Sequence, residues 1–251
     1  RYDARVPTVV GPVARLAPVF VEDARFLRQQ TCQPIKWALP GPMTMIDTLY
    51  DAYYHSRKQL AFEFARILNQ EARDLVGAGV DIIQFDEPAF NVFFDDVNDW
   101  GIEALELAIE GLRCETAVHI CYGYGIQANT AWKKTLGEQW RQYEKILPKL
   151  KESNIDIVSL ECHNSRVPLE LLELVRGKKV MVGAIDVANH QIETPAEVAA
   201  TLRSALQYVD ADKLYPCTNC GMAPLPRHIA RQKLAALSAG AALLRQELQC
   251  R

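Results

Sequence analysis

The 251-residue sequence lacks the features that mark several large classes of protein. It has no long run of Lys or Arg, and 28 basic residues against 31 acidic ones give a net charge of −3. A nucleic-acid groove or a membrane-binding surface needs concentrated positive charge, so we expect no nucleic-acid or membrane partner. No stretch approaches the roughly 18 consecutive apolar residues of a membrane span. The first five residues also lead into no apolar segment of a signal peptide.

Cysteine is present, but in a pattern that does not suggest disulfide bonds. Seven cysteines are an odd number, scattered through a chain that is long enough to bury a core without covalent cross-links. Because no export signal is visible, we expect the reducing cytoplasm, where cysteine is usually a small buried residue, a metal ligand or a catalyst.

Short β-rich runs alternate with longer amphipathic segments. Apolar residues recur at helical spacing between residues 56 and 78, and Gly77 and Gly79 end that helix. We predict strands at residues 35–39, 80–85, 116–121, 155–160, 180–185 and 213–216. We predict helices near residues 56–78, 99–112, 139–152, 168–175, 195–209 and 227–248.

This alternation predicts an α/β fold with a parallel sheet. A TIM-type (β/α)8 barrel is favoured because polar residues follow many different strands, as a barrel active site requires. An open sheet concentrates them near one switch point, and no G-x-G-x-x-G follows a first strand. We predict a single catalytic barrel domain over residues 1–251. Six strand–helix units are fewer than eight, so either strands escape detection or the first βαβ portion lies upstream of Arg1, which we favour. The proline-rich run 7–13 suits an added hairpin or edge strand.

Four strand ends carry the residues that point to chemistry. His119 and Cys121 are two apart on a strand, so their side chains face the same side. Glu161 follows the next strand, and Cys220 follows the last one. One His, two Cys and one carboxylate form a sensible four-ligand set for Zn²⁺, and a closed barrel brings its strand ends together. The pair Asp86-Glu87 follows a fourth strand.

Each of these signals has an ordinary alternative. A lone His-x-Cys arises often by chance, and a lone Cys-x-x-Cys is also found in redox motifs and among core cysteines. Cys217 lies in the same turn as Cys220 and is the weaker candidate for the fourth position. A purely structural zinc usually has closely spaced ligand pairs, whereas these ligands span about a hundred residues. Their coincidence at successive strand ends favours a catalytic metal site.

At these residues the sequence resembles the C-terminal catalytic barrel of cobalamin-independent methionine synthase. The similarity runs from about Val19 onward and rests on motifs in a fixed order. They are Gly41-Pro42-Met43-Thr44, Ile83-Gln84-Phe85-Asp86-Glu87-Pro88-Ala89, His119-Ile120-Cys121-Tyr122, Glu161, Gly183-Ala184-Ile185-Asp186 and Asn219-Cys220-Gly221.

The resemblance implies a zinc-dependent methyltransferase that forms methionine from homocysteine and a methyl donor. It implies that His119, Cys121, Glu161 and Cys220 hold the zinc, and that Asp86 holds the amino group of homocysteine. We expect Glu87 to assist Asp86, Asn164 and Ser165 to contact the substrate, and Glu161 to be the ligand that loosens when homocysteine enters. The family's barrel begins upstream with a strand and a turn that bind the substrate carboxylate, so we expect this chain to be part of a longer protein.

Two departures from the family pattern leave the methyl donor open. Ala188 stands where the family carries the His that protonates the departing folate nitrogen, and His190 follows two residues later. The segment after Gly-Pro-x-Thr that contributes to folate binding also differs. Methyltetrahydrofolate, another methyl carrier such as a corrinoid, and a partner protein that supplies the methyl group are all open. A corrinoid-directed thiol methyltransferase, a uroporphyrinogen-decarboxylase-like barrel and a zinc-stabilised binding scaffold are the competing interpretations.

Overall fold

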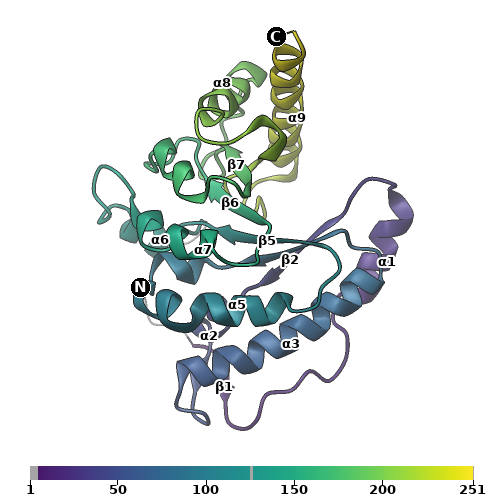
Figure 1. Ribbon diagram of the computed structural model, residues 1–251, viewed down its shortest axis with the longest axis vertical. Coiled ribbons are helices and arrows are strands. Elements are labelled where there is room, and N and C mark those ends of the chain that lie inside the picture. The colour runs from purple at the N-terminus through teal and green to yellow at the C-terminus, as the bar shows by residue number, and fades with distance from the viewer. Residues whose placement is uncertain (1–4, 125–126, 251) are drawn as a thin grey trace. The chain divides into compact units, whose positions relative to one another are not determined.

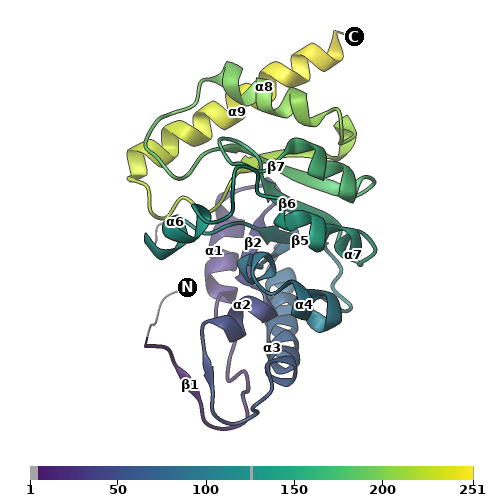
Figure 2. The same ribbon diagram turned by 90° about the vertical axis from the view of Figure 1, so that its left-hand side faces the viewer.

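A computed structural model describes residues 5–124 and 127–250, and the chain is organised into two structural units. The N-terminal unit comprises the residues up to Ile120 together with Glu152–Ile157. The C-terminal unit comprises Cys121–Lys151 together with the residues from Val158 onward. Figures 1 and 2 show the ribbon in two views.

The N-terminal unit is built around three parallel strands. They lie in the order β2-β4-β5, with Lys36 opposite Ile82 and Asp86 opposite His119. Helices α3 and α5 pack against each other and are seen side by side in Figure 1. The main elements are α1 (Val21–Gln30), β2 (Lys36–Pro40), α2 (Pro42–Asp47), α3 (Arg57–Gly77), β4 (Ile82–Asp86), α5 (Ile102–Ile109) and β5 (Glu115–Ile120).

The ends of α3 show how local sequence sets the boundaries of the elements. The Ser56 side chain accepts a hydrogen bond from the Gln59 amide at 3.2 Å and caps the first turn. Leu60, Leu68 and Leu75 are among the buried residues of the helix and recur at helical spacing. Gly79 has a φ of +98°, the left-handed conformation that follows many helix ends.

The C-terminal unit contains strands in the order β6-β7-β8, of which β7 and β8 are paired in parallel. Helices α8 and α9 pack on each other, and α8 also packs on β7 (Figure 2). Thr194 and Glu197 form a reciprocal capping box at the start of α8, and Pro195 occupies its first turn. The elements are α6 (Gln127–Lys133), α7 (Leu147–Lys151), β6 (Ile157–Glu161), β7 (Lys179–Ile185), α8 (Pro195–Ala205), β8 (Leu214–Thr218) and α9 (Arg227–Gln249).

All six predicted strands are present, but several helices differ from the prediction. The predicted helix near 139–152 is a 3₁₀ turn (Gln142–Lys145) followed by the short α7, because Pro148 has no N–H and fits only a first helical turn. The segment predicted as a helix at 168–175 is a 3₁₀ helix over Leu169–Val175.

The helical run predicted near 99–112 begins earlier. It comprises α4 (Phe94–Asp96), a π-helical turn (Val97–Gly101) and α5. The remaining short helical turns are 3₁₀ segments at Pro88–Asn91 and Ala211–Lys213.

The proline-rich segment near the N-terminus forms an edge structure. Its β1 (Thr8–Val9) pairs in parallel with β3 (Tyr50–Asp51), apart from the main strands of this unit. Its partner strand lies about forty residues further along the chain and runs parallel to it. The segment is therefore an edge strand and not a hairpin, the two possibilities that the sequence allowed.

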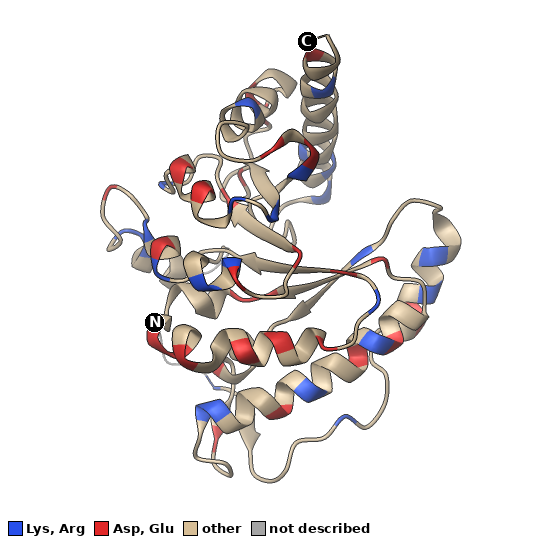
Figure 3. Cartoon of the chain, in the orientation of Figure 1, with Lys and Arg blue, Asp and Glu red and all other residues tan. Residues whose placement is uncertain are grey.

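Charge is mixed along the long helices of both units. Figure 3 shows Lys and Arg alternating with Asp and Glu along α3, and both signs occur on α9. Among the residues that the structure describes, no helix combines the length and apolar character needed to cross a bilayer.

Candidate metal and substrate site

The candidate metal ligands lie at the C-terminal ends of strands. His119 is the penultimate residue of β5, and Cys121 follows two residues later. Cys220 lies two residues beyond the end of β8. His119, Cys121 and Cys220 each offer one ligand atom, and these atoms all lie within 4.8 Å of one another. Because imidazole and thiolate are preferred ligands of Zn²⁺, this group fits a metal ion of that kind.

The two thiols are in direct contact inside the C-terminal unit. Cys220 Sγ lies 3.4 Å from Cys121 Sγ and donates a weak hydrogen bond to it. This hydrogen bond, together with burial, raises the pKa of Cys121 well above its ordinary value. A thiol that resists ionisation becomes a thiolate when a metal ion binds to it, since ligation requires the deprotonated form.

Cys217, the alternative in the same turn, lies elsewhere. Its Sγ lies 3.8 Å from Ser159 Oγ. Among the described residues, the cluster of possible metal ligands contains Cys220 but not Cys217.

Glu161 ends β6 and is completely buried. Its Oε1 accepts a hydrogen bond from the Tyr122 amide at 2.7 Å, and its Oε2 accepts one from the Tyr124 hydroxyl. Burial raises the pKa of Glu161, against the opposing effects of Lys133 and the two hydrogen bonds. Electrostatic interaction with Cys220 also acts on this carboxyl. The ligand atoms that lie within 4.8 Å of one another belong to His119, Cys121 and Cys220, and Glu161 is not part of that group.

Lys133 is a charged neighbour of this site that the sequence analysis missed. Its Nζ lies 3.5 Å from the centre of the Tyr124 ring, a cation–π arrangement. Burial lowers the pKa of Lys133, while Glu161, Cys121 and Cys220 oppose that shift. The ammonium group of Lys133 therefore interacts electrostatically with the carboxyl group of Glu161 and with both cysteines. Nothing in the pattern around Trp132-Lys133-Lys134 distinguishes this lysine from a surface residue.

Asp86 lies at the end of β4 in register with His119 on β5. It is partly exposed, and its Oδ1 accepts a hydrogen bond from Gln84 Nε2 at 2.7 Å. Gln84 in turn accepts one from Lys36 Nζ at 2.5 Å. In parallel strands, residues in register face the same side, so the carboxylate lies beside the histidine and is accessible to a cationic group.

Glu87 differs from the expectation that it assists Asp86. It is fully buried, and its carboxylate accepts hydrogen bonds from the first turn of α2: Met43 N at 2.9 Å, Thr44 N at 2.9 Å and Thr44 Oγ1 at 2.7 Å. Burial raises its pKa to about 8. Gly41 allows this approach, since a Cβ there would lie 2.2 Å from the Glu87 side chain. Glu87 therefore holds the start of α2 in place.

The remaining predicted residues occupy the loops after β6 and β7. Asn164 is exposed and has a φ of +50°, and Ser165 Oγ accepts a hydrogen bond from Val167 N at 3.4 Å. Ala188 and His190 lie in an exposed turn, where Asp186 Oδ1 accepts a hydrogen bond from Ala188 N at 2.7 Å.

A buried ion pair that the sequence analysis also missed supports these loops. Lys233 Nζ lies 3.1 and 3.0 Å from the two carboxylate oxygens of Glu193, and Glu193 Oε1 accepts a hydrogen bond from Asp186 N at 2.9 Å. Lys233 is fully buried, although its position in α9 gives no sign of that in the sequence.

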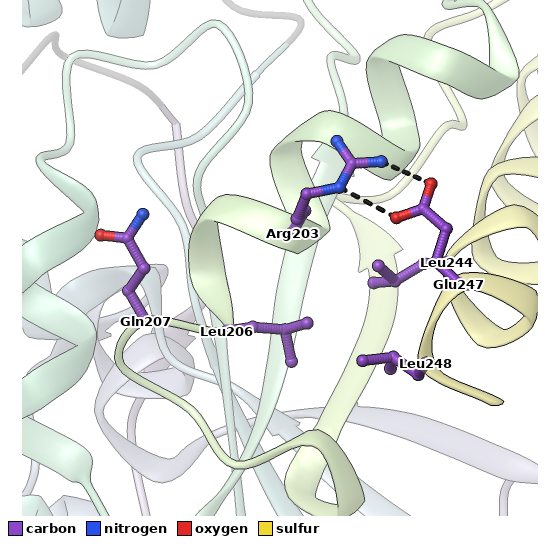
Figure 4. Close-up of a pocket in the computed structure, with 6 residues that line it drawn as sticks. All are labelled: Arg203, Leu206, Gln207, Leu244, Glu247 and Leu248. Carbon is purple, nitrogen blue, oxygen red and sulfur yellow. Dashed lines mark hydrogen bonds and ion pairs between the residues drawn. The ribbon is translucent and has the colours of Figure 1, made fainter. Parts of the chain in front are cut away.

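A surface pocket in the C-terminal unit lies away from this chemistry. Figure 4 shows it between α8 and α9, lined by Arg203, Leu206, Gln207, Leu244, Glu247 and Leu248. An adjoining pocket reaches Leu214, where β8 begins, whereas Cys220 follows the opposite end of that strand. Arg203 and Glu247, which line the pocket of Figure 4, form an ion pair with N–O distances of 3.0 and 2.6 Å. We assign this pocket to helix packing.

Comparisons with known proteins agree on one family. The family model described as cobalamin-independent synthase, catalytic domain, matches residues 2–242. The methionine synthase of Sulfurisphaera tokodaii is 34% identical over 246 residues, which cover 98% of this chain and 67% of that protein. A solved B12-independent methionine synthase from Shewanella sp. W3-18-1, in complex with selenomethionine, is 75% identical. Its TM-score is 0.98, and the match covers 100% of this chain and 74% of that one.

A more distant solved structure shares the fold. It is described as a putative vitamin-B12 independent methionine synthase from Listeria monocytogenes, with 18% identity, a TM-score of 0.70 and coverage of 96% of this chain and 73% of that one. The α/β fold of the barrel type predicted from the sequence is thereby confirmed.

Proposed function

Because the chain belongs to the family of cobalamin-independent synthase catalytic domains, which are methyltransferases, we propose that it methylates the thiol of homocysteine to form methionine. The observation that carries this proposal is the convergence of His119, Cys121 and Cys220 within 4.8 Å. The selenomethionine bound by the Shewanella relative supports it, since selenomethionine is the selenium analogue of the proposed product.

The metal in this proposal is zinc, held by His119, Cys121, Cys220 and Glu161. The donor set of one imidazole, two thiolates and one carboxylate suits Zn²⁺ better than the oxygen-binding Mg²⁺ or Ca²⁺. Bound zinc would lower the pKa of a substrate thiol that joins its ligands, so that the sulfur is a thiolate at neutral pH. Glu161 is the ligand that yields its place, because a carboxylate binds zinc less tightly than a thiolate does.

The chain's own side chains orient the substrate for an in-line displacement. Asp86 accepts charge-assisted hydrogen bonds from the homocysteine ammonium group, and Asn164 and Ser165 contact the rest of the amino acid. The sulfur lone pair forms the new S–CH₃ bond as the bond between the methyl group and its carrier breaks. The electron pair of that bond stays on the carrier, and a carrier nitrogen then takes up a proton.

The donor that we propose is methyltetrahydrofolate. When a folate loses its methyl group, the folate nitrogen takes up a proton, whereas the cobalt of a methylated corrinoid does not. The chain therefore needs an acid near the turn that contains Ala188 only if the donor is a folate. His190 lies in the same exposed turn and is the candidate for that acid. A partner protein that delivers a methylated corrinoid is the competing source.

Methionine formation by the zinc-loaded protein tests this proposal. The assay supplies homocysteine with methyltetrahydrofolate, as mono- and triglutamate, or with methylcobalamin. We expect product with a folate donor, loss of at least about a hundredfold in rate for Cys220→Ala, and near-normal rate for the matched control Cys217→Ala. Turnover with methylcobalamin alone would identify a corrinoid-directed enzyme. No turnover with any donor, by a protein that holds zinc, would contradict the proposal.

A further inference from the structure

Asn219 is a buried amide placed among three strand ends of the C-terminal unit. It is 1% exposed, and it lies between the last residue of β8 and Cys220. Its Oδ1 accepts hydrogen bonds from Cys162 N at 3.2 Å and His163 N at 3.3 Å, and its Nδ2 donates one to His163 O at 2.7 Å. Its own backbone N–H donates to Ile185 O at 2.9 Å.

These hydrogen bonds tie together the residues that adjoin two candidate ligands. Cys162 directly follows Glu161, and Cys220 directly follows Asn219. One side chain therefore links the end of β6 to the end of β8, and its backbone links β8 to the end of β7. The Thr218 hydroxyl adds a hydrogen bond to Cys220 O at 2.8 Å, which fixes the turn that carries the thiol.

The neighbouring strand leaves room for this amide. A Cβ on Gly183 would lie 2.4 Å from Asn219 Oδ1 and 2.9 Å from Leu160 O, far inside van der Waals contact. A glycine inside a strand often marks such a close approach. Any larger residue at position 183 would displace either the amide or the end of β6.

The amide chemistry is also specific. The two N–H groups at Cys162 and His163 need an acceptor, and the carbonyl of His163 needs a donor. Asn supplies both from one side chain, whereas Asp has the same shape but no N–H to donate.

We propose that Asn219 is a positioning residue that sets the spacing between Glu161 and Cys220 and so determines the metal affinity of the site. The inference rests on the proposed metal site. Metal–ligand distances tolerate only about 0.2 Å, and the partners that orient ligands typically change metal affinity by about 10–100-fold when mutated. A side chain that holds the main chain next to two ligands belongs among those partners.

Three variants and one matched control test the proposal. Asn219→Asp keeps the shape and removes the donor, and Asn219→Ser removes the amide without adding volume. Gly183→Ala keeps Asn219 but pushes its side-chain amide out of place, because the added Cβ would lie 2.4 Å from Asn219 Oδ1. The control is Gly240→Ala in the same unit, whose Cβ would lie 2.5 Å from the Val198 side chain and 2.8 Å from Pro195 O, where α8 meets α9.

The readouts are the zinc dissociation constant, from competition with a chromophoric chelator, and the denaturant midpoint of the metal-free protein. We expect the zinc affinity of the two Asn219 variants and of Gly183→Ala to fall by about 10–100-fold. Gly240→Ala should be destabilised by its own steric clash and yet bind zinc like the wild type. If one variant does not fold, the others carry the comparison.

Wild-type affinity in the folded Asn219 and Gly183 variants would overturn the positioning role and leave the proposed function intact. An equal loss of affinity in Gly240→Ala would also overturn it, because the effect would then follow general destabilisation. A wild-type protein that binds no zinc would overturn the metal site itself, and the inference with it.

Discussion

Two fully buried glutamates at strand ends, Glu87 after β4 and Glu161 at the end of β6, have different surroundings. All the hydrogen bonds of the Glu87 carboxyl group come from the first turn of α2, through two backbone amides and the Thr44 hydroxyl. These two carboxyl oxygens accept from N–H groups that a helix start would otherwise leave without acceptors. Its role is to join a helix to a sheet within the N-terminal unit.

Glu161 is equally buried, but its neighbours include ionisable side chains of the candidate site. It accepts hydrogen bonds from Tyr122 N and the Tyr124 hydroxyl, and it interacts electrostatically with Lys133 and Cys220. Burial raises the pKa of both carboxyls, so the direction of the shift does not distinguish them. The groups that surround a buried carboxyl, and not its burial, therefore distinguish a structural residue from a candidate metal ligand.

Glu161→Gln gives the largest effect expected from this comparison. The amide is a poor zinc ligand, so zinc affinity should fall by more than the roughly 10–100-fold typical of residues that only orient ligands. The stability of the metal-free protein should change little, because the Tyr124 hydroxyl, unlike a backbone N–H, can turn to accept a hydrogen bond from the NH₂ group of the new amide. Chelator competition and denaturant unfolding measure the two quantities. A wild-type zinc affinity in this variant would remove Glu161 from the ligand set.

Glu87→Gln should have the reverse pattern. The amide has one acceptor oxygen, and its NH₂ group would face a donor in the first turn of α2. An unsatisfied buried donor costs about 1–3 kcal/mol, so the free energy of unfolding should fall by that amount. Zinc affinity should stay at the wild-type value. A clear loss of zinc binding with unchanged stability would show that Glu87 belongs to the site after all.

The same variant should also change how stability depends on pH. The pKa of Glu87 is raised from 4.5 to about 8, so the folded state holds a proton that the unfolded state releases. The contribution of this group is therefore fully present below about pH 4.5 and is lost as the pH rises toward 8. The stability gap between wild type and Glu87→Gln should narrow over this range in unfolding curves. A gap that widens with pH would contradict the raised pKa.

Tyr124→Phe should give the smallest effect. It removes one hydrogen bond to Glu161 Oε2 and leaves the ring beside Lys133. A typical hydrogen bond contributes about 0.5–1.5 kcal/mol, so zinc affinity should fall by about tenfold at most. The matched variant Tyr143→Phe changes a ring that packs against Tyr122 in the same unit and should leave zinc binding unaltered. Equal losses in both variants would indicate a general packing effect.

Features that depend on the local pattern of apolar and polar residues could be predicted from the sequence. Alternation of apolar runs predicted all six strands, and the strong helical periodicity of α3 and α9 predicted both long helices. The strand-end positions of His119, Cys121 and Cys220 predicted a group that the structure brings together. Helix α1 was missed because its exposed face leaves few apolar residues, with only Val21 and Ala24 buried.

Other features depend on contacts between distant residues, which a local pattern does not contain. Glu87 looked like a second substrate-binding carboxylate because it adjoins Asp86, but its partners Met43 and Thr44 lie more than forty residues earlier. Lys233 on α9 resembles a surface lysine until Glu193 is placed beside it. Asn219 was visible as part of a motif, but its role follows from the approach of β6 and Gly183.

Zinc content together with X-ray absorption at the zinc edge, with and without homocysteine, tests the central claim most directly. The proteins are wild type, Cys220→Ala and the control Cys217→Ala. We predict one zinc per chain in the wild type and in Cys217→Ala, with one more sulfur ligand when homocysteine is added, and loss of zinc from Cys220→Ala. Zinc that is absent, or that responds neither to homocysteine nor to the loss of Cys220, would contradict thiol activation at this site.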